Sequence, residues 1–399
     1  MRKYYITTVL FFIVLMAGIS GYFSDSFIKS IARVWETKPL KVEGSFNQDM
    51  KRLIGEIDNE INSNTGFRLQ FVELHGAVQK YTGNSIVKDA DKTVVKLKNN
   101  KLSFYYFSVE KEKLDWESQQ LSKLSQFTNR MGIPLLYLQA PFKIEKNSEQ
   151  LPEGLSDYIN EDVDYFLKKL STDTQVDYVD LRELMKIKKL EYDAAFFNTD
   201  HHWKPETAFW AYTQIAHIIK DKYGFVIPEK VLSLKNYNIK EYKNYFLGSE
   251  GKRVGRYYGG VDDFSLIYPK FHTDLEFKIP SKNLTKKGTY LQTVIDHNSL
   301  GVKDYYNKNP YAAYTGGDYP LNIIINRQAP NQKKVLLVRD SYSCPFAAFL
   351  SMGVNELHII DLRHYNKSLL NYIKKEKPDL VLFLYYPTRL NDFDTFQFN

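Results

Sequence analysis

The sequence predicts an α/β protein in which helices alternate with the buried strands of a largely parallel sheet. Amphipathic helical periods alternate with short apolar runs along residues 111–222 and again along residues 331–399. Most of these apolar runs are continuous, which is typical of strands that are covered on both faces. The chain has 399 residues, 43% of them hydrophobic and 25% charged, so it can form a large globular core.

The first element is an uncharged, largely apolar run at residues 4–23, which follows two basic residues. As a helix it matches a hydrocarbon core roughly 30 Å thick. We therefore expect residues 1–26 to form a membrane anchor or uncleaved signal. The rest of the chain would then lie outside the cytoplasm, as the extracytoplasmic domain of a single-pass protein of the cell membrane. The small residues Ala17 and Gly18 keep a cleaved signal peptide as the alternative.

Residues 27–110 are expected to form an N-terminal segment of helix and β-hairpin. Apolar residues recur at helical spacing between residues 47 and 82. Two strand-like runs within residues 92–108 then flank Asn99 and Asn100, and such a pair predicts a hairpin.

Residues 111–222 are expected to be the first part of the α/β domain. The apolar pattern predicts helices at residues 113–131, 157–171, 181–189 and 206–222, and strands at residues 133–141 and 176–180.

Residues 223–330 have a different composition, rich in Gly, Asn and Tyr, with short alternating stretches at residues 264–268 and 289–295. We predict an inserted region of mixed β and loop structure there. The second part of the α/β domain follows in residues 331–399. Its strands are expected at residues 333–340, 356–362 and 378–387, and its helices at residues 345–352 and 367–375.

Composition excludes several classes of protein. The single cysteine, Cys344, rules out a disulfide framework and any multi-cysteine metal site within the chain. The net charge of +7 comes from 54 basic and 47 acidic residues without a basic run, so we expect no nucleic-acid partner. The 30 Tyr, 26 Phe and 4 Trp residues suit stacking against sugar rings, although a compositional bias is the simpler explanation of their number.

Two polar turns at strand ends or helix starts carry the residues of a nucleophilic site. Asp340 and Ser341 end a predicted strand, where a serine hydroxyl is either a nucleophile or a helix cap. Asp200, His201 and His202 precede a predicted helix, and a mere cap does not require this combination. Together the turns supply the nucleophile, base and carboxylate that acyl transfer through a serine needs.

The residue types suggest how the roles are divided. His202 would accept the Ser341 proton, and Asp200 would accept the other imidazole N–H, which fixes the tautomer. Residues two apart do not face each other on a helix, so this pair requires a non-helical turn. The Tyr342 N–H at the start of a helix is the expected first donor to the oxyanion.

The two motifs carry a family resemblance. The segments DHHWKP, residues 200–205, and VRDSYS, residues 338–343, resemble in this order the DHHW family of bacterial surface proteins. That family is similar to the SGNH-hydrolase-like alginate O-acetyltransferases. The resemblance covers residues 45–399 and implies a flavodoxin-like, three-layer α/β domain in circularly permuted order, in which the strand bearing the nucleophile comes after the Asp-His turn.

The resemblance also implies an activity. It assigns Ser341 as nucleophile, His202 as general base and Asp200 as its partner. It implies the transfer of acetyl groups to a cell-surface polysaccharide, often with a membrane-bound O-acyltransferase as acyl supplier. Together with the N-terminal apolar run this predicts a membrane-anchored enzyme, and we expect no metal or other cofactor. A carbohydrate esterase of the same fold and an inactive glycan-binding or scaffold protein remain alternatives.

Further candidates for oxyanion or substrate binding lie near the two turns in sequence or by expected location. They are Tyr342, Arg339, His201, Trp203, Tyr314, Gly316, Gly317 and Asn391. Arg339 stands where the wider superfamily has a glycine, and Gly316, Gly317 and Asn391 are chosen by location alone. The glycine-rich residues 248–263 predict either a loop over the site or solvated turns.

Two other chemistries have weaker support. Asp-His-His also occurs as a metal-ligand motif, as in metal-dependent phosphoesterases, but the remaining histidines are scattered without ligand spacing. Cys344 falls inside a predicted helix and not at its turn, so it is a poor nucleophile candidate.

Overall fold

The computed structural model describes residues 68–174, 176–391 and 393–398, which fall into two compact units divided after Gly83. In the first unit the described element is helix α4 (Arg68–Tyr81), within the helical region predicted from the sequence. The predicted membrane span at residues 4–23 lies outside the described residues. Among the described helices, none combines the length and the apolar character that crossing a bilayer requires.

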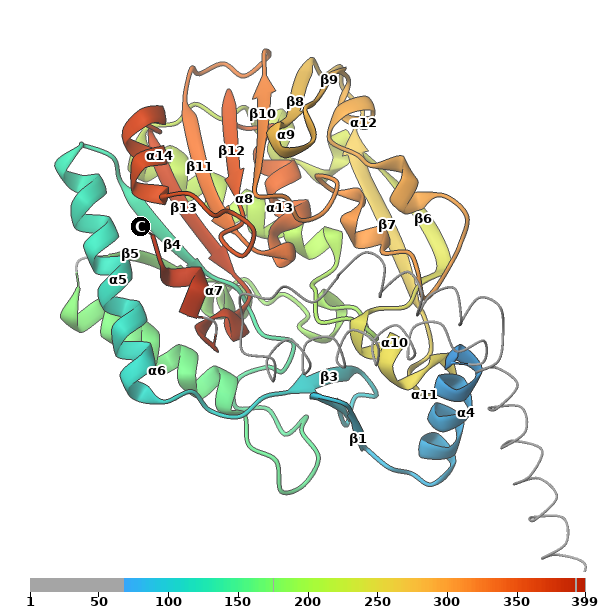
Figure 1. The fold of residues 1–399 in the computed structure, drawn as a ribbon. Coiled ribbons are helices and arrows are strands. Elements are labelled where there is room, and N and C mark those ends of the chain that lie inside the picture. Colours follow the sequence, from blue (N-terminus) through green and yellow to red (C-terminus); the bar gives the residue numbers. More distant parts are fainter. Residues whose placement is uncertain (1–67, 175, 392, 399) are drawn as a thin grey trace, which may run out of the picture. The chain divides into compact units, whose positions relative to one another are not determined.

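The second unit is built on an eight-stranded sheet with the order β5-β4-β13-β11-β12-β10-β8-β9 (Figure 1). Its strands are β4 (Leu135–Gln139), β5 (Asp177–Asp180), β8 (Leu275–Ile279), β9 (Leu284–Gly288), β10 (Leu321–Asn326), β11 (Lys334–Arg339), β12 (Glu356–Ile360) and β13 (Leu380–Tyr385). The first five in spatial order are parallel, and β10, β8 and β9 extend the sheet in antiparallel fashion.

The parallel strands have a permuted flavodoxin-like order. If β11 is counted first, then β12, β13, β4 and β5 follow, and their order across the sheet is 2-1-3-4-5. The fourth strand of this topology, β4, therefore comes before the first strand, β11, in the sequence. In such a sheet ligands bind beyond the carboxyl ends of strands one and three, here β11 and β13.

Helices cover both faces of the sheet because its central strands are apolar on both sides. On one face lie α5 (Lys111–Arg130), α6 (Tyr158–Asp173) and α14 (Leu369–Glu376), and on the other lie α7 (Leu181–Ile187), α8 (Pro205–Tyr223) and α13 (Cys344–Leu350). Leu336 and Val338 of β11 pack into the first layer, whereas Val335 and Leu337 pack into the second. This alternation follows from the two-residue period of a strand.

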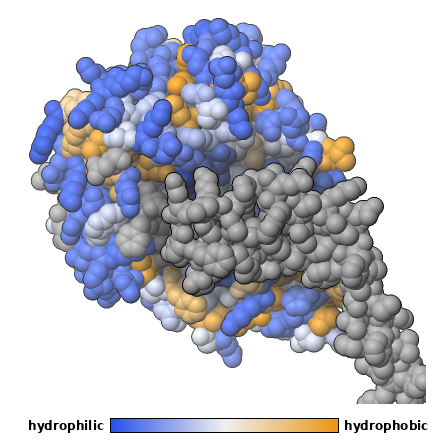
Figure 2. All heavy atoms as spheres, in the orientation of Figure 1, coloured by the Kyte–Doolittle hydropathy of each residue, from blue (hydrophilic) through white to orange (hydrophobic). Residues whose placement is uncertain are grey.

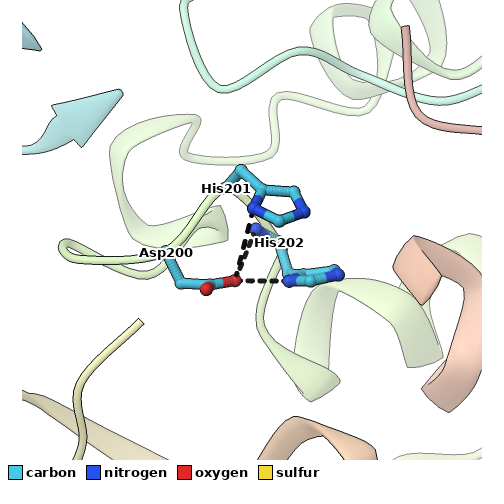
Figure 3. Close-up of side chains that lie close together, drawn as sticks. All are labelled: Asp200, His201 and His202. Atoms are coloured by element: carbon cyan, nitrogen blue, oxygen red, sulfur yellow. Dashed lines mark hydrogen bonds and ion pairs between the residues drawn. The ribbon is translucent and has the colours of Figure 1, made fainter. Parts of the chain in front are cut away.

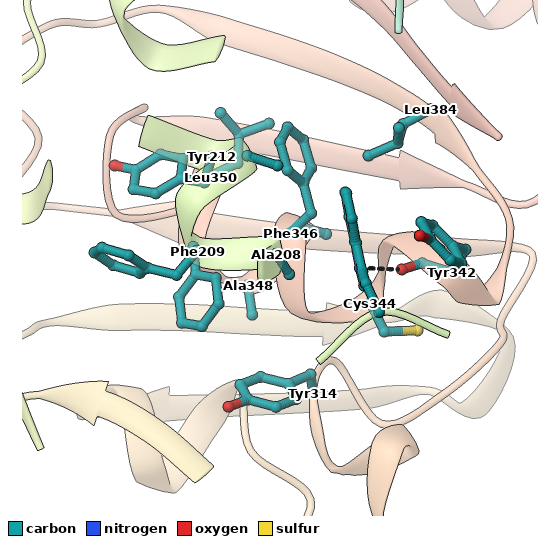
Figure 4. Close-up of a cluster of buried hydrophobic side chains, with 14 of the residues drawn as sticks. Ala208, Phe209, Tyr212, Tyr314, Tyr342, Cys344, Phe346, Ala348, Leu350 and Leu384 are labelled. Atoms are coloured by element: carbon teal, nitrogen blue, oxygen red, sulfur yellow. Dashed lines mark hydrogen bonds between the residues drawn. The ribbon is translucent and has the colours of Figure 1, made fainter. Parts of the chain in front are cut away.

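Helix α8 fixes the turn at residues 200–202 relative to the serine turn at residues 340–343. Pro205 suits its first turn, and Gly224 ends it in the left-handed conformation with φ 68°. Its apolar face, including Phe209 and Tyr212, packs against α13, which follows the serine turn (Figure 4). The same cluster includes Tyr342 of the serine turn itself.

The inserted residues 223–330 partly complete the main sheet. Besides β8, β9 and β10, they form the antiparallel pair β6 (Tyr237–Phe246) and β7 (Asp262–Pro269) and the short helices α9 (Glu229–Leu232), α10 (Ser249–Val254), α11 (Arg256–Gly259) and α12 (Tyr290–Thr293). The alternating stretch at residues 289–295, taken as a sign of mixed β and loop structure, contains helix α12. Thr289 and Gln292 form a capping box there, which starts a helical turn instead.

A small antiparallel sheet of β1 (Ile86–Asp89), β2 (Lys92–Lys96) and β3 (Leu102–Tyr105) confirms the predicted hairpin. It shares a buried cluster with α10 and α11 through Leu102, Phe104, Val254 and Tyr258. The described surface visible in Figure 2 is mostly hydrophilic, with small hydrophobic areas.

The described chain also contains short 3-10 turns. They are η1 (Asp193–Ala195), η2 (Leu234–Asn236), η3 (Pro280–Lys282), η4 (His297–Leu300), η5 (Pro310–Ala313), η6 (Ser341–Ser343), η7 (Pro387–Asn391) and η8 (Phe393–Phe396).

Candidate active site

The serine turn lies at the carboxyl end of β11, where a 3-10 turn replaces the first turn of the following helix. Asp340 is the cap of this turn: its Oδ1 accepts from the Tyr342 N–H at 3.1 Å. Its Oδ2 accepts from the Tyr386 N–H at 3.1 Å, which joins the turn to the end of β13. Because Asp340 is the cap, the Ser341 hydroxyl remains available for chemistry.

The second motif forms the non-helical turn that its chemistry requires. Asp200 Oδ1 accepts from the backbone N–H of His202 at 3.0 Å and also from the Nδ1 of that residue (Figure 3). The turn brings His202 Nε2 to 3.2 Å from Ser341 Oγ. A carboxylate only accepts, so Nδ1 carries the imidazole proton and Nε2 is left to accept from the Ser341 hydroxyl.

Asp200 is ionised and fully engaged. Its second oxygen, Oδ2, accepts from the Ser249 N–H at 2.7 Å and from the Ser249 hydroxyl at 2.9 Å. Burial alone would raise the pKa of Asp200, but His202, His201 and these hydrogen bonds hold it well below its usual range. The carboxylate therefore stays charged beside His202 and stabilises a developing imidazolium.

Two residues that sequence analysis did not assign hold this turn in place. Asp262 of β7 accepts from the Asn198 N–H at 2.6 Å and from the Thr199 N–H at 2.8 Å, on the chain just before Asp200. Ser249 begins α10 and anchors Asp200 from another side. Residues 248–263, predicted as a binding loop or solvated turns, thus supply the support of the Asp-His turn.

Gly248 permits the close approach of this support. A Cβ atom at residue 248 would lie 2.1 Å from Asp200 Cβ and 2.4 Å from the Thr199 carbonyl oxygen. Gly248→Ala must therefore displace Asp200 or α10. We expect kcat/KM to fall roughly 10²-fold, as small misplacements in active sites do, and the free energy of unfolding to fall by about 1–3 kcal/mol.

Kinetics and urea unfolding of Gly248→Ala test this expectation. The control is Gly154→Ala: Gly154, unlike Gly248, has a positive φ of 80°, but no atom lies within 4 Å of an added Cβ there. That variant should lose about 1–2 kcal/mol of stability from backbone strain and keep its kcat/KM. Equal kcat/KM for both variants would contradict the role of Gly248.

Trp203 and Tyr311 anchor the serine turn through one carbonyl group. The Tyr342 carbonyl oxygen accepts from Trp203 Nε1 at 3.0 Å and from the Tyr311 hydroxyl at 2.6 Å. The Tyr311 ring also stacks on His202 with a centroid distance of 4.0 Å. Trp203 is fully buried, so it is a positioning residue and not the expected substrate contact. Tyr311 was missed because its role arises only from tertiary contacts.

Three further expectations are corrected by the hydrogen bonds. The Tyr342 N–H donates to Asp340 and is not a free oxyanion donor in this arrangement. Arg339 is fully buried, where it pairs with Asp318 at 2.5 Å and donates to the Gly317 carbonyl at 2.8 Å. Tyr314 is also buried, and its hydroxyl donates to the Ser265 carbonyl of β7.

The remaining candidates for oxyanion binding differ in where the structure places them. Gly316 and Gly317 form a turn with φ of 73° and 95°, which Arg339 ties to β11. The side chain of Asn391 lies outside the described part of the structure. At the start of η6 the Ser341 N–H has no acceptor within its own turn, so it is the donor best placed beside the nucleophile.

Ligand distances alone would allow a metal at three described clusters: Asp200-His201-His202, Asp318-Asp361-His364 and Glu356-His358-Glu376. In the first, His202 Nδ1 is a hydrogen-bond donor and both Asp200 oxygens already accept from N–H or O–H groups. In the second, Arg363 pairs with Asp361 at 2.6 Å and with Asp318 at 3.1 Å. The donor sets of these two clusters fit hydrogen bonds and ion pairs better than a cation.

His201 lies beside the catalytic residues and affects the pH dependence of stability. Burial and the neighbouring His202 lower the pKa of His201 from 6.5 to about 3. Between these values the unfolded chain binds a proton at His201 and the folded protein does not. The free energy of unfolding should therefore decrease as the pH falls from about 6.5 toward about 3.

Melting temperatures across this pH range test the shift. His201→Phe removes this proton uptake, so its melting temperature should fall less on acidification than that of the native protein. His217→Phe, on the exposed side of α8, is the matched control and should follow the native protein. Parallel curves for native protein and His201→Phe would show that the ring is not protected from protonation.

Comparison with known proteins relates this architecture to a family. A domain family described as "SGNH hydrolase-like domain, acetyltransferase AlgX" matches residues 103–244, which include the Asp200–His202 turn. Bacillus cereus PatB1, in a structure with a sulfonyl adduct, is 24% identical with a TM-score of 0.65, over 78% of this chain and 100% of that chain.

A DHHW family protein from Eubacterium siraeum is 17% identical with a TM-score of 0.56, over 78% of this chain and 95% of its own. No curated protein sequence matches the chain significantly. At these identities the solved structures establish the fold. The chain therefore contains an SGNH hydrolase-like α/β domain, and the resemblance to the DHHW and SGNH-hydrolase-like proteins that its motifs predict is confirmed.

Proposed function

We propose that the protein is an O-acyltransferase that moves an acetyl group to a carbohydrate hydroxyl through an acyl-Ser341 intermediate. One observation carries the proposal: Ser341 Oγ, His202 Nε2 and Asp200 form a continuous hydrogen-bonded line, with 3.2 Å between the serine and the imidazole. This is the arrangement that activates a serine for acyl transfer. The acetyltransferase description of the matching domain family supports the choice of acyl group.

In the first half-reaction Ser341 Oγ attacks the acyl carbon of the donor, and its proton passes to His202 Nε2. Asp200 stabilises the imidazolium that forms. The tetrahedral oxyanion receives a hydrogen bond from the Ser341 N–H. His202 then gives its proton to the leaving group, and the bond between acyl carbon and donor breaks.

In the second half-reaction an acceptor hydroxyl attacks the acyl-serine. His202 Nε2 accepts the hydroxyl proton and returns it to Ser341 Oγ as the ester bond to the serine breaks. A sugar hydroxyl as acceptor gives transfer, and water gives hydrolysis, so an esterase would use the same residues.

The place of action that we propose rests on the apolar run at residues 4–23. A single-pass anchor there would hold the domain outside the cytoplasm at the cell membrane, next to surface polysaccharides. Acetyl groups would have to be supplied across the bilayer, which fits a membrane-bound O-acyltransferase as partner. Loss of turnover on addition of a chelator would show that the reaction depends on a metal instead.

Mass spectrometry of surface glycans tests the proposed function. Cells that express the native protein should carry O-acetyl groups that are lost when Ser341→Ala replaces it. Ser171→Ala, an exposed serine of α6, is the matched control and should leave the glycans as in the native cells. Identical O-acetylation with Ser341→Ala would contradict the transferase and favour a scaffold or binding role.

A further inference from the structure

His201 occupies a position that the mechanism above does not use. Its ring lies 3.9 Å from the His202 ring, and 22% of its side chain is exposed. Each of the two rings turns one nitrogen toward Asp200 and the other away from it (Figure 3). Among the described residues, Ser249 hydrogen-bonds to the His201 ring at Nδ1, and none hydrogen-bonds to Nε2. A polar atom thus faces outward beside the base.

The hydrogen bonds around Ser249 decide which His201 nitrogen carries the proton. Ser249 Oγ lies 2.9 Å from Asp200 Oδ2, and only the serine proton can join it to an ionised carboxylate. The same oxygen lies 2.9 Å from His201 Nδ1, so it must accept there and Nδ1 must be the donor. Because His201 is neutral, its Nε2 is left without a proton and accepts hydrogen bonds.

Glu250 completes this assignment. Its Oε2 lies 3.1 Å from Ser249 Oγ, and burial raises the pKa of Glu250 above its usual range. Ser249 Oγ is placed as donor to Glu250 as it is to Asp200, so its single proton is turned toward these two carboxyl groups and not toward His201. The tautomer of His201 is therefore fixed by buried groups and not by solvent.

In the acyl-enzyme two imidazole acceptors lie side by side. Once Ser341 Oγ is esterified, His202 Nε2 is free to accept from the attacking hydroxyl. His201 Nε2 belongs to the neighbouring ring, whose centroid lies 3.9 Å from that of His202 at an interplanar angle of 34°, and it accepts as well. Two acceptors on adjacent rings can receive hydrogen bonds from two hydroxyl groups on neighbouring carbons of one acceptor ring.

We infer that His201 is an acceptor-binding residue: its Nε2 accepts a hydrogen bond from the hydroxyl adjacent to the one that is acylated, so the protein selects vicinal diols. The inference rests on the proposed function. In the transfer step the attacking hydroxyl forms the new ester bond and gives its proton to His202, while the neighbouring hydroxyl keeps its proton. The buried rings of Tyr386 and Phe104 border the His201 ring at centroid distances of 5.2 Å and 6.4 Å and hold the imidazole in place.

Two small acceptors isolate this contact. Cyclohexane-1,2-diol and cyclohexanol share a ring and differ by one hydroxyl, and p-nitrophenyl acetate serves as acyl donor for the full-length protein. The native protein should prefer the diol in kcat/KM by roughly tenfold, the value of one hydrogen bond. In His201→Phe the preference for the diol should fall to the ratio expected because the diol has two hydroxyl groups and cyclohexanol has one. His201→Gln, which keeps an acceptor oxygen, should restore part of it.

The acylation burst separates this inference from the proposed function. A merely structural His201 would lower the burst and both acceptor reactions together, whereas an acceptor-binding His201 changes the ratio of the two acceptors. An undiminished diol preference in His201→Phe would overturn the inference. A native protein that shows no burst at all would overturn the acyl-serine mechanism on which it rests.

Discussion

Replacing Ser341 by alanine should lower kcat/KM for an activated acetyl ester by roughly four to six orders of magnitude, because it removes the atom that forms the covalent intermediate. The fold should tolerate the change. The Ser341 hydroxyl has one hydrogen bond, to His202, and the turn is capped by Asp340 and anchored through the Tyr342 carbonyl. The melting temperature should therefore stay close to that of the native protein.

Kinetics with p-nitrophenyl acetate and a thermal melt of the same preparations measure both expectations. The control Ser171→Ala should match the native protein in each. If Ser341→Ala retained turnover within tenfold of the native value, the nucleophile would have to be another group. A loss of turnover together with a collapse of the melting temperature would require a second variant, Ser341→Cys, which keeps a nucleophilic atom at the same position.

Replacing Asp200 by asparagine should lower kcat/KM by roughly 10³- to 10⁴-fold. The native carboxylate accepts four hydrogen bonds, two from His202 and two from Ser249. An amide has one oxygen, so its NH₂ group must face the donors of one of these residues. Either His202 loses the partner that fixes its tautomer, or the start of α10 is pushed away.

The two consequences can be told apart by measuring stability with activity. Loss of the tautomer lowers kcat with little change in the free energy of unfolding, whereas displacement of α10 lowers both. Asp221→Asn, at an exposed position of α8, is the control and should leave both quantities unaltered. Activity of Asp200→Asn within tenfold of the native value would show that His202 acts without its carboxylate.

Much of the α/β core could be predicted from local patterns. The strands around residues 133–141, 333–340 and 378–387 are continuous apolar runs, and the structure places them next to one another as β4, β11 and β13. Helix α8 was predicted from its proline start and apolar face. These elements depend on residues close in sequence, so the period of the pattern is sufficient.

Strand pairing within residues 223–330 could not be predicted in the same way. Strands β8 and β10 join the main sheet beside β12, although each has only a short apolar pattern. Their partners lie elsewhere in the chain, and no local signal specifies which edge an antiparallel strand extends. The alternating apolar pattern at residues 289–295 did not identify the structure either. Its apolar residues are buried, but they belong to a capped helical turn and not to a strand.

The juxtaposition of Ser341 with His202 was predicted from motif chemistry, but its supports were not. Ser249 and Asp262 contact the Asp-His turn across 48 or more residues of sequence, and Tyr311 reaches His202 from the insertion. The expected substrate-binding role of Arg339 was wrong for the same reason, because its partners are distant in sequence. A basic residue beside a nucleophile suggests substrate binding, and only the fold reveals that Asp318 and Asp361 neutralise it in the core.

The central claim is that Ser341 carries the acyl group. The most direct test is to mix the full-length protein with p-nitrophenyl acetate, quench with acid during the burst, and map the acetylated peptide by mass spectrometry. The account predicts one acetyl group per chain, located on Ser341 and absent from Ser341→Ala. An acetyl group that forms at the burst rate on another residue, or turnover without any acetylated intermediate, would contradict it.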